Sequence, residues 1–215
     1  MKVLVISDVH GNLPALEHVI SKHKDVDLVI SLGDVVNYGP WSNECVQLLE
    51  TLNNKVTILG NHEEFFLKGA YEGMNIVAQT FFKFCYPRFS KHTEIEQYIP
   101  IYSQANCEFT HTLENKYIFP DTEVAIERDT FIGHSHRLFS NQYGKYRLVN
   151  VGSVGQNRLN IDEINYALWN PEKNDVQLCN EFFSADMLIN EMKLKEYPTI
   201  CLDYILSKRN KNGKN

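Results

Sequence analysis

The first sixty residues alternate between short apolar runs and stretches of helical spacing, and this order limits the accessible folds more than any other feature. The apolar runs are residues 2–7, 27–32 and 55–59. Their Val, Ile and Leu content is typical of strands that are buried on both faces. Between them, residues 13–24 and 43–52 carry apolar side chains at helical spacing. A β-α-β-α-β order predicts parallel strands with ligands bound at their carboxyl ends.

The rest of the chain predicts a second sheet and a helical segment between the two halves. Strand-like runs cover residues 107–110, 130–132, 147–151, 166–169 and 176–182, and a hairpin turn fits residues 170–175. Residues 63–100 lack a strand signal and are rich in Phe and Tyr, which predicts a helical cap inserted over one side of the ligand-binding edge. An amphipathic helix over residues 185–206 is expected to break near Pro198.

We therefore expect one domain over residues 1–215. The expected fold class is α/β (α+β): a four-layer αββα sandwich in which two mixed β-sheets pack face to face and helices flank both. Residues 208–215 are basic and without apolar side chains, so we expect a flexible tail there. Self-association through the C-terminal helix would give a homo-oligomer, but packing of this helix against the core is the simpler interpretation.

Composition and charge exclude some function classes. The chain has 215 residues, 43% hydrophobic and 22% charged, as in an ordinary globular domain. Its net charge of −6 disfavours tight binding to long nucleic acid but allows a small phosphorylated ligand. Five Cys residues without a CxxC pair indicate reduced thiols. No apolar run reaches the roughly 20 residues of a membrane span, so we expect a cytoplasmic protein without a signal peptide or membrane contact.

Five short polar clusters stand where strand-like runs end. They are Asp8-Val-His10, Gly33-Asp34, Gly60-Asn61-His62-Glu63, Thr110-His111-Thr112 and Gly133-His134-Ser135-His136. Carboxylate, imidazole and amide oxygen donors suit Mn, Fe or Zn ions, and the lack of a Cys pair argues against a structural zinc site. Each cluster alone is weak evidence, because a single His is more often a hydrogen-bonded structural residue. All five together, each behind a strand, predict one metal site at the edge of the sheets.

This pattern resembles the calcineurin-like metallophosphoesterases, whose signature is DxH, GD, GNH[DE], a separate His and GHxH. The motifs occur in family order over residues 8–136, and the strand pattern extends the resemblance to about residue 183. The runs Tyr38-Gly39-Pro40, Glu44-Cys45 and Gly152-Ser-Val-Gly-Gln-Asn-Arg158 are similar to a bacterial branch of small phosphodiesterases and dinucleoside tetraphosphatases.

The resemblance implies two divalent metal ions, with Mn²⁺ expected and Fe, Zn, Ni, Co or Mg as alternatives. The implied ligands are Asp8, His10 and His136 for one metal, Asn61, His111 and His134 for the second, and Asp34 bridging both. A bridging carboxylate implies metals about 3.5–4 Å apart that share a water molecule, whose hydroxide form attacks phosphorus in line. His111 is the least secure ligand, because Thr112 follows it where the family usually has Gly; His92 is its competitor.

Three further residues receive roles from the resemblance. His62 would contact phosphate or protonate the leaving oxygen, with Asp8 or Glu63 orienting it; otherwise it is an imidazole that only supports the ligands. Asn37 stands where relatives often have Gly, and it would either allow the same turn or reach the substrate. Arg158 would bind a phosphate through two N–H groups, the alternative being a surface ion pair.

The function implied is hydrolysis of phosphodiester or phosphoanhydride bonds in a small, nucleotide-like substrate. An asymmetric diadenosine tetraphosphate hydrolase is a more specific form of this hypothesis, and a protein Ser/Thr phosphatase is a rival. A non-catalytic scaffold of the same fold is a third class, although all seven ligand positions are intact. The aromatic residues of the cap either stack a nucleobase or, more simply, pack helices against the domain.

Overall fold

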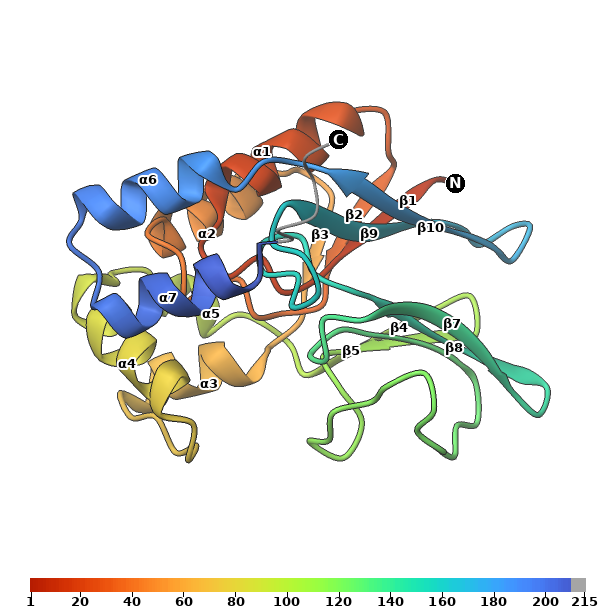
Figure 1. The fold of residues 1–215 in the computed structure, drawn as a ribbon. Helices are drawn as coiled ribbons and strands as arrows, with labels where there is room; N and C mark the ends of the chain where they lie inside the picture. Colours follow the sequence, from red (N-terminus) through yellow and green to blue (C-terminus); the bar gives the residue numbers. More distant parts are fainter. Residues whose placement is uncertain (210–215) are drawn as a thin grey trace, which may run out of the picture.

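Two five-stranded sheets packed face to face form the centre of the protein (Figure 1). The computed structural model describes residues 1–209. The first sheet has the strand order β10-β9-β1-β2-β3. Its strands are β1 (Val3–Ile6), β2 (Leu28–Ser31), β3 (Lys55–Thr57), β9 (Glu163–Asn170) and β10 (Asp175–Phe182). As predicted, β1, β2 and β3 run parallel, and the hairpin β9–β10 pairs antiparallel with the β1 edge.

The second sheet has the order β4-β5-β6-β8-β7. Its strands are β4 (Ile101–Gln104), β5 (Cys107–Thr110), β6 (Asp129–Ile132), β7 (Leu138–Tyr143) and β8 (Tyr146–Val151). The central strands β5, β6 and β8 are parallel, and β4 and β7 pair antiparallel at the two edges. The sequence did not predict β4 or β7. Both are edge strands that expose much of their length, so they lack the apolar run by which a buried strand is recognised.

Aromatic rings fill the space between the two sheets. Phe109, Phe131 and Trp169 are almost completely buried there, with ring centroids 4.8–5.6 Å apart. Burial of three such rings stabilises the sandwich by several kcal/mol, roughly 2–3 for each. Their packing also fixes how the sheets are stacked, so the carboxyl ends of β1, β2, β5 and β6 meet at one edge.

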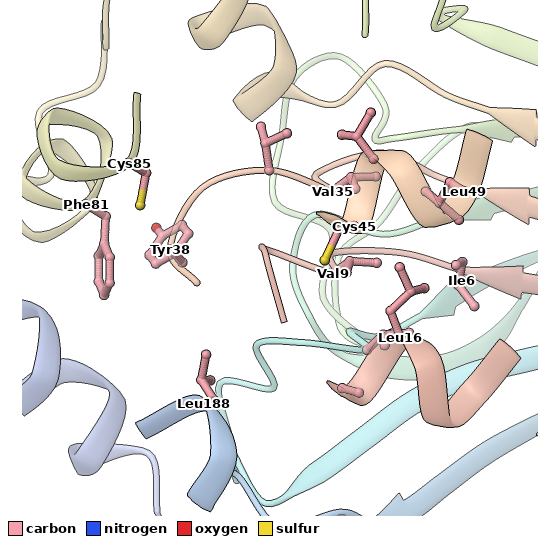
Figure 2. Close-up of a cluster of buried hydrophobic side chains, with 14 of the residues drawn as sticks. Ile6, Val9, Leu16, Val35, Tyr38, Cys45, Leu49, Phe81, Cys85 and Leu188 are labelled. Atoms are coloured by element: carbon pink, nitrogen blue, oxygen red, sulfur yellow. The ribbon is translucent and has the colours of Figure 1, made fainter. Parts of the chain in front are cut away.

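Helices cover the outer face of the first sheet (Figure 1). They are α1 (Leu13–Lys22), α2 (Ser42–Glu50), α6 (Asp186–Leu194) and α7 (Thr199–Ser207), the last two separated near Pro198 as predicted. Figure 2 shows part of the core beneath them, in which Ile6 of β1, Leu16 of α1 and Leu49 of α2 lie in one cluster. The C-terminal helices therefore pack on the core, which was the simpler interpretation of their apolar faces.

The cap consists of α3 (Asn61–Lys68), α4 (Ile76–Cys85), a 3-10 turn (Tyr86–Arg88) and α5 (His92–Ile95). Four of its aromatic side chains, namely Phe66, Phe81, Phe82 and Phe89, belong to the buried core. They serve packing, as the simpler interpretation held. Phe65 and Tyr71 differ, because they line the cavity described below.

The outer face of the second sheet has no helical cover in the described residues. Residues 111–128, an irregular segment, pack Ile118 against Ile132, Phe139 and Leu148 of this face. The two-sheet sandwich with flanking helices is confirmed, but a loop replaces the helical layer that was expected here. Among residues 1–209, none of the helices combines the length and apolar content that crossing a membrane requires. All five cysteines are free.

The described structure continues two residues into the predicted flexible tail. Arg209 donates from Nε to Asp162 Oδ2 at 2.9 Å and from Nη2 to Asp162 Oδ1 at 3.0 Å, and it also contacts Asp186. Asp162 in turn accepts the N–H of Ala185 before α6. A distant carboxylate thus holds Arg209 in place. The flexibility of residues 208–215 stays a prediction, and residues 210–215 lie outside the described residues.

Replacing Arg209 by Ala is expected to lower the free energy of unfolding by about 0.5–1 kcal/mol at pH 7, a modest value because the pair is partly exposed to solvent. Burial raises the pKa of Asp162, but the Arg209 bonds and that of Ala185 N–H lower it by more. A carboxyl whose pKa falls on folding contributes stability above its unfolded pKa and loses it as the pH falls. Urea unfolding should therefore show a difference at pH 7 that shrinks towards about pH 3, whereas Arg128→Ala should change little at either pH.

Candidate metal centre

Three overlapping groups of His and Asp side chains meet at the edge where strands of both sheets end. The groups are Asp8–His10–His136, His10–Asp34–His62 and Asp34–His111–His134, and within each the potential ligand atoms lie within 4.8 Å of one another. Apart from His62 in the first turn of α3, these residues follow the carboxyl ends of β1, β2, β5 and β6. Parallel pairing of β1 with β2 and of β5 with β6 places these ends side by side.

The first predicted site is compact. His136 Nε2 lies 3.0 Å from Asp8 Oδ1, His10 Nε2 lies 3.7 Å from the same oxygen, and the two imidazole nitrogens are 3.3 Å apart. All three side chains are at most 1% exposed. One cation could therefore contact all three residues.

The second predicted site lies beside it and shares Asp34. His111 Nε2 is 3.2 Å from Asp34 Oδ2, 3.1 Å from Asn61 Oδ1 and 3.1 Å from His134 Nδ1. Asp34 Oδ2 is also 3.9 Å from His10 Nε2. Asp34 thus stands between the two sites, where the resemblance puts a bridging ligand.

Hydrogen bonds outside the cluster decide which imidazole atoms face it. Nδ1 of His10, His111 and His136 lies against the backbone carbonyl of Val36, Leu32 and Gln156, respectively. A carbonyl only accepts, so each Nδ1 carries a proton and each Nε2 is the ring nitrogen that faces the cluster and can bind a cation when it is unprotonated. Asp8 Oδ1, at the centre of the first group, has no hydrogen-bond donor. Acceptor atoms that crowd together without donors fit a cation, so the residues present suit two divalent metal ions.

The charges of the site also favour a cation. Burial raises the pKa of Asp34, but His111 and His62 lower it by more, and the pKa of Asp8 is likewise lowered by His136 despite burial. Both carboxylates are therefore ionised. Burial lowers the pKa of His111, but the charge of Asp34 raises it to about 10. The field that favours a proton on His111 equally favours a metal ion beside it.

Backbone strain is concentrated at this edge. Five of the seven predicted ligands have a left-handed backbone, with φ between 48° and 63°: Asp8, His10, Asp34, His134 and His136. Such φ values are uncommon for residues other than Gly, and strain of this kind clusters at functional sites. Gly133 lies so close to Asp8 that a Cβ would be 2.5 Å from Asp8 Oδ2 and would overlap Ser7 Oγ. The glycine in this motif is therefore required by space.

His62 and Asn37 form a pair beside the ligands. Asn37 Nδ2 lies 2.9 Å from His62 Nδ1, so the amide donates and the imidazole proton is on Nε2. Burial lowers the pKa of His62 to about 3, although Asp34 acts in the opposite direction, which keeps the ring neutral. Asn37 has a φ of 71° and is fully buried. Asn37 therefore adopts the turn and contacts His62, while its predicted contact with substrate stays a prediction.

Glu63 binds the backbone of two loops and was only weakly indicated by the sequence. Oε1 accepts the N–H groups of Val35 and Val36 at 2.7 and 3.1 Å, and Oε2 accepts those of Asp34 and Gly60 at 2.8 and 2.9 Å. That Glu63 orients His62 stays a prediction, because its hydrogen bonds among the described residues go to these four backbone groups. Glu63 holds the loops that carry Asp34 and Asn61 in place.

A cavity of about 540 Å³ opens next to these groups. Its wall contains Asn61, His62, His111 and His134 together with Arg158 and an aromatic set that consists of Tyr38, Phe65, Tyr71, Tyr117 and Tyr204. The ring of Tyr117 stacks on that of His134 with centroids 4.2 Å apart. The sequence analysis gave no site role to Tyr38, Tyr117 or Tyr204. Tyr38 occurs in the Tyr38-Gly39-Pro40 run, and neither Tyr117 nor Tyr204 belongs to a metal-ligand motif.

Arg158 lies in this wall, where its guanidinium carbon is 5.3 Å above the centre of the Tyr117 ring. No carboxylate of the described residues forms an ion pair with it, and Nε has no hydrogen-bond partner there. The surface ion pair that was its alternative role is therefore not found in this part of the chain. The two candidates for the isolated metal histidine lie in different places. His111 lies beside Asp34 and Asn61, whereas His92 packs on Tyr86 and Phe89 in the cap.

Comparison with known proteins agrees with this geometry. The family model described as calcineurin-like phosphoesterase matches residues 1–186. Protein MJ0912 of Methanocaldococcus jannaschii, whose own function is uncharacterized, is 30% identical over 214 residues, which cover 82% of this chain and 85% of that protein. The metallophosphoesterase from Sphaerobacter thermophilus is 25% identical, with a TM-score of 0.76 over 97% of this chain and 100% of that one.

A further solved structure supports the fold alone. The hypothetical protein PH1004 of Pyrococcus horikoshii OT3 has a TM-score of 0.82 at 16% identity, and the match covers 95% of this chain and 97% of that one. Family match, sandwich fold and buried His/Asp groups thus agree with one another. The chain belongs to the calcineurin-like phosphoesterase family and is a metal-dependent hydrolase of phosphoric esters.

Proposed function

We propose that this enzyme uses two divalent metal ions to hydrolyse phosphodiester or phosphoanhydride bonds in a small, nucleotide-like substrate. The observation that carries the proposal is the convergence of seven donor residues in two groups that share Asp34, beside a cavity of about 540 Å³. Asp8, His10 and His136 would hold one ion, Asn61, His111 and His134 the other, and Asp34 both. When bound, such ions lower the pKa of a shared water and neutralise charge on the phosphoryl oxygens.

The protein's own residues supply the remaining chemistry. His62 lines the cavity, and with Nδ1 occupied by Asn37 it keeps a proton on Nε2. It can therefore donate a hydrogen bond from Nε2 to an oxygen of the phosphoryl group. Protonation of the leaving oxygen, the other predicted role, would require His62 to gain a second proton when substrate binds. Arg158, which has no carboxylate partner among the described residues, would offer its guanidinium to the non-bridging oxygens. Both groups favour a substrate whose charge lies on phosphate.

The aromatic wall supports a nucleotide as the substrate class. Phe65, Tyr71 and Tyr117 belong to the cavity wall and, unlike Phe66 or Phe81, are not fully buried in the core. Flat rings beside a phosphate site suit a nucleobase, which gains by stacking on them. The diadenosine tetraphosphate hypothesis is the most specific form of this proposal.

The expected result is that the purified protein supplied with Mn²⁺ hydrolyses bis(p-nitrophenyl) phosphate, and that a chelator abolishes the activity until metal is returned. A panel of phosphomonoesters, cyclic nucleotides, a phosphoserine peptide and diadenosine tetraphosphate then ranks substrate classes, with Mn, Fe, Zn, Ni, Co and Mg compared. Formation of ATP plus AMP, seen by chromatography, identifies asymmetric cleavage of the last substrate. A protein that binds no metal and cleaves none of these compounds is a scaffold, while cleavage of the peptide alone indicates a protein phosphatase.

A further inference from the structure

A second cavity of about 560 Å³ lies on the other side of the segments that form the first. Its wall includes Phe119, His136, Arg137, Asn157 and Leu159. His136 is a predicted ligand, so this cavity adjoins the candidate metal centre. Neither the sequence motifs nor the first cavity accounts for it.

Three segments separate the two cavities and contribute to both. Tyr117, His134 and Arg158 line the first cavity, whereas Phe119, His136 and the neighbours of Arg158, namely Asn157 and Leu159, line the second. The ring planes of Tyr117 and Phe119 are nearly parallel, 13° apart, with centroids separated by 6.3 Å. Neighbouring residues of the same three segments thus line the two cavities, and the predicted ligands His134 and His136 are among them.

Arg137 is a cation without a protein partner in this cavity. Three other arginines, Arg128, Arg147 and Arg209, each lie beside a carboxylate. Within residues 1–209, Arg137 has neither an ion pair nor a hydrogen bond, although it is only partly exposed. A guanidinium in such a position can bind a phosphate through two N–H groups.

Asparagine amides form the polar part of the same wall. Asn157 donates to Asn165 at 2.9 Å, Asn165 donates to Asn180 at 2.9 Å, and Asn180 donates to Glu163 at 3.1 Å. These bonds fix the amides and engage the carboxylate of Glu163, and each amide still has one N–H or one lone pair for a ligand. Asp121, the other acid of this wall, is exposed to solvent. Fixed amides beside apolar Phe119 and Leu159 suit a sugar or a base attached to phosphate.

We propose that the second cavity binds the far half of a two-sided substrate, with Arg137 contacting a phosphate of that half and the asparagines its nucleoside. This inference rests on the proposed function and sharpens it: the preferred substrate carries a nucleotide on each side of the bond that is cleaved. A phosphomonoester fills the first cavity alone. Arg137 is then a residue that determines specificity.

The test compares Arg137→Met and Arg137→Lys with Arg128→Met, a matched control whose arginine lies away from both cavities. We expect Arg137→Met to lower kcat/KM for diadenosine tetraphosphate about 10- to 100-fold, mainly through KM. Its loss on p-nitrophenyl phosphate should be at least tenfold smaller, and Arg137→Lys should restore part of the activity on the dinucleotide. Equal losses on both substrates, or none on the dinucleotide, would overturn the inference.

A binding experiment keeps this result separate from the proposed function. ADP binding is measured by calorimetry in EDTA for two variants. The first is Arg158→Met, which weakens phosphate binding in the first cavity, and the second is the double variant Arg158→Met with Arg137→Met. Binding that is lost only in the double variant supports the second cavity even if no substrate is hydrolysed. If the enzyme is active but its affinity for ADP does not change when Arg137 is replaced, the assignment of the second cavity is contradicted and the proposed hydrolysis is unaffected.

Discussion

Replacing Asp34 by Asn is expected to lower kcat/KM on bis(p-nitrophenyl) phosphate by about 10³-fold, or about 4 kcal/mol in transition-state stabilisation. Asp34 belongs to two of the three groups of potential ligands. Its Oδ1 accepts the backbone N–H of His62 at 2.9 Å. Its Oδ2 lies 3.2 Å from His111 Nε2 and 3.9 Å from His10 Nε2. An amide keeps the shape but removes the negative charge that would hold two cations near each other.

Metal content and activity should be measured together for this variant. Mass spectrometry of the protein after dialysis is expected to give close to two metal ions for the wild type and fewer for Asp34→Asn. Asp203→Asn, on the exposed side of α7, controls for the loss of one negative charge. An Asp34→Asn protein that keeps both ions and full activity would reject the bridging role of Asp34, whereas a wild-type protein that is active with one ion would reject the two-metal mechanism.

Replacing Glu63 by Gln is expected to lower the free energy of unfolding by about 2–4 kcal/mol. Each carboxylate oxygen of Glu63 accepts two backbone N–H groups. In either orientation, the NH₂ group of a Gln side chain would therefore face two backbone N–H groups, which are donors as well. Burial and the charge of Asp34 raise the pKa of Glu63 to about 7, which reflects the cost of a charged carboxylate there. Because Gln is uncharged and removes that cost, any stability that the Glu63→Gln variant loses must come from the missing hydrogen bonds to the four backbone N–H groups.

Thermal unfolding in EDTA measures this effect without a contribution from bound metal. For a chain of this size we expect a fall in Tm of about 5–15 °C. Glu64→Gln is the matched control, because Glu64 is the next residue of the same helix but is exposed, and its Tm should stay within about 1 °C. Equal Tm values for both variants would show that the loops after β2 and β3 do not depend on Glu63.

Local sequence patterns predicted the strands that are buried on both faces. β1 and β2 appear within one residue of the expected ends, because their continuous apolar runs must be hidden from water on each side. The same reasoning missed β4 and β7, whose edge positions require few apolar side chains. It also gave no sign of the contact between Arg209 and Asp162, a residue 47 positions earlier.

The candidate site divides in a similar way. Asp8, His10, Asp34, Asn61, His111, His134 and His136 were expected to meet because parallel strands end at a common edge, and they do lie together. Asn37 and Glu63 each contact a segment that only folding brings near, and the sequence did not predict these contacts. Tyr117 and Tyr204 of the first cavity and Arg137 of the second belong to none of the motifs that the sequence shows.

The sequence by itself determined the order of strands and helices, the residues that can donate to metal and the family to which they belong. These follow from periodicity and from short motifs, which are properties of neighbouring residues. Only the tertiary structure decided which imidazole nitrogen faces the cluster, which arginines lack a carboxylate and where two cavities lie. Such features depend on contacts between residues far apart in the chain, and those contacts form only when the two sheets pack.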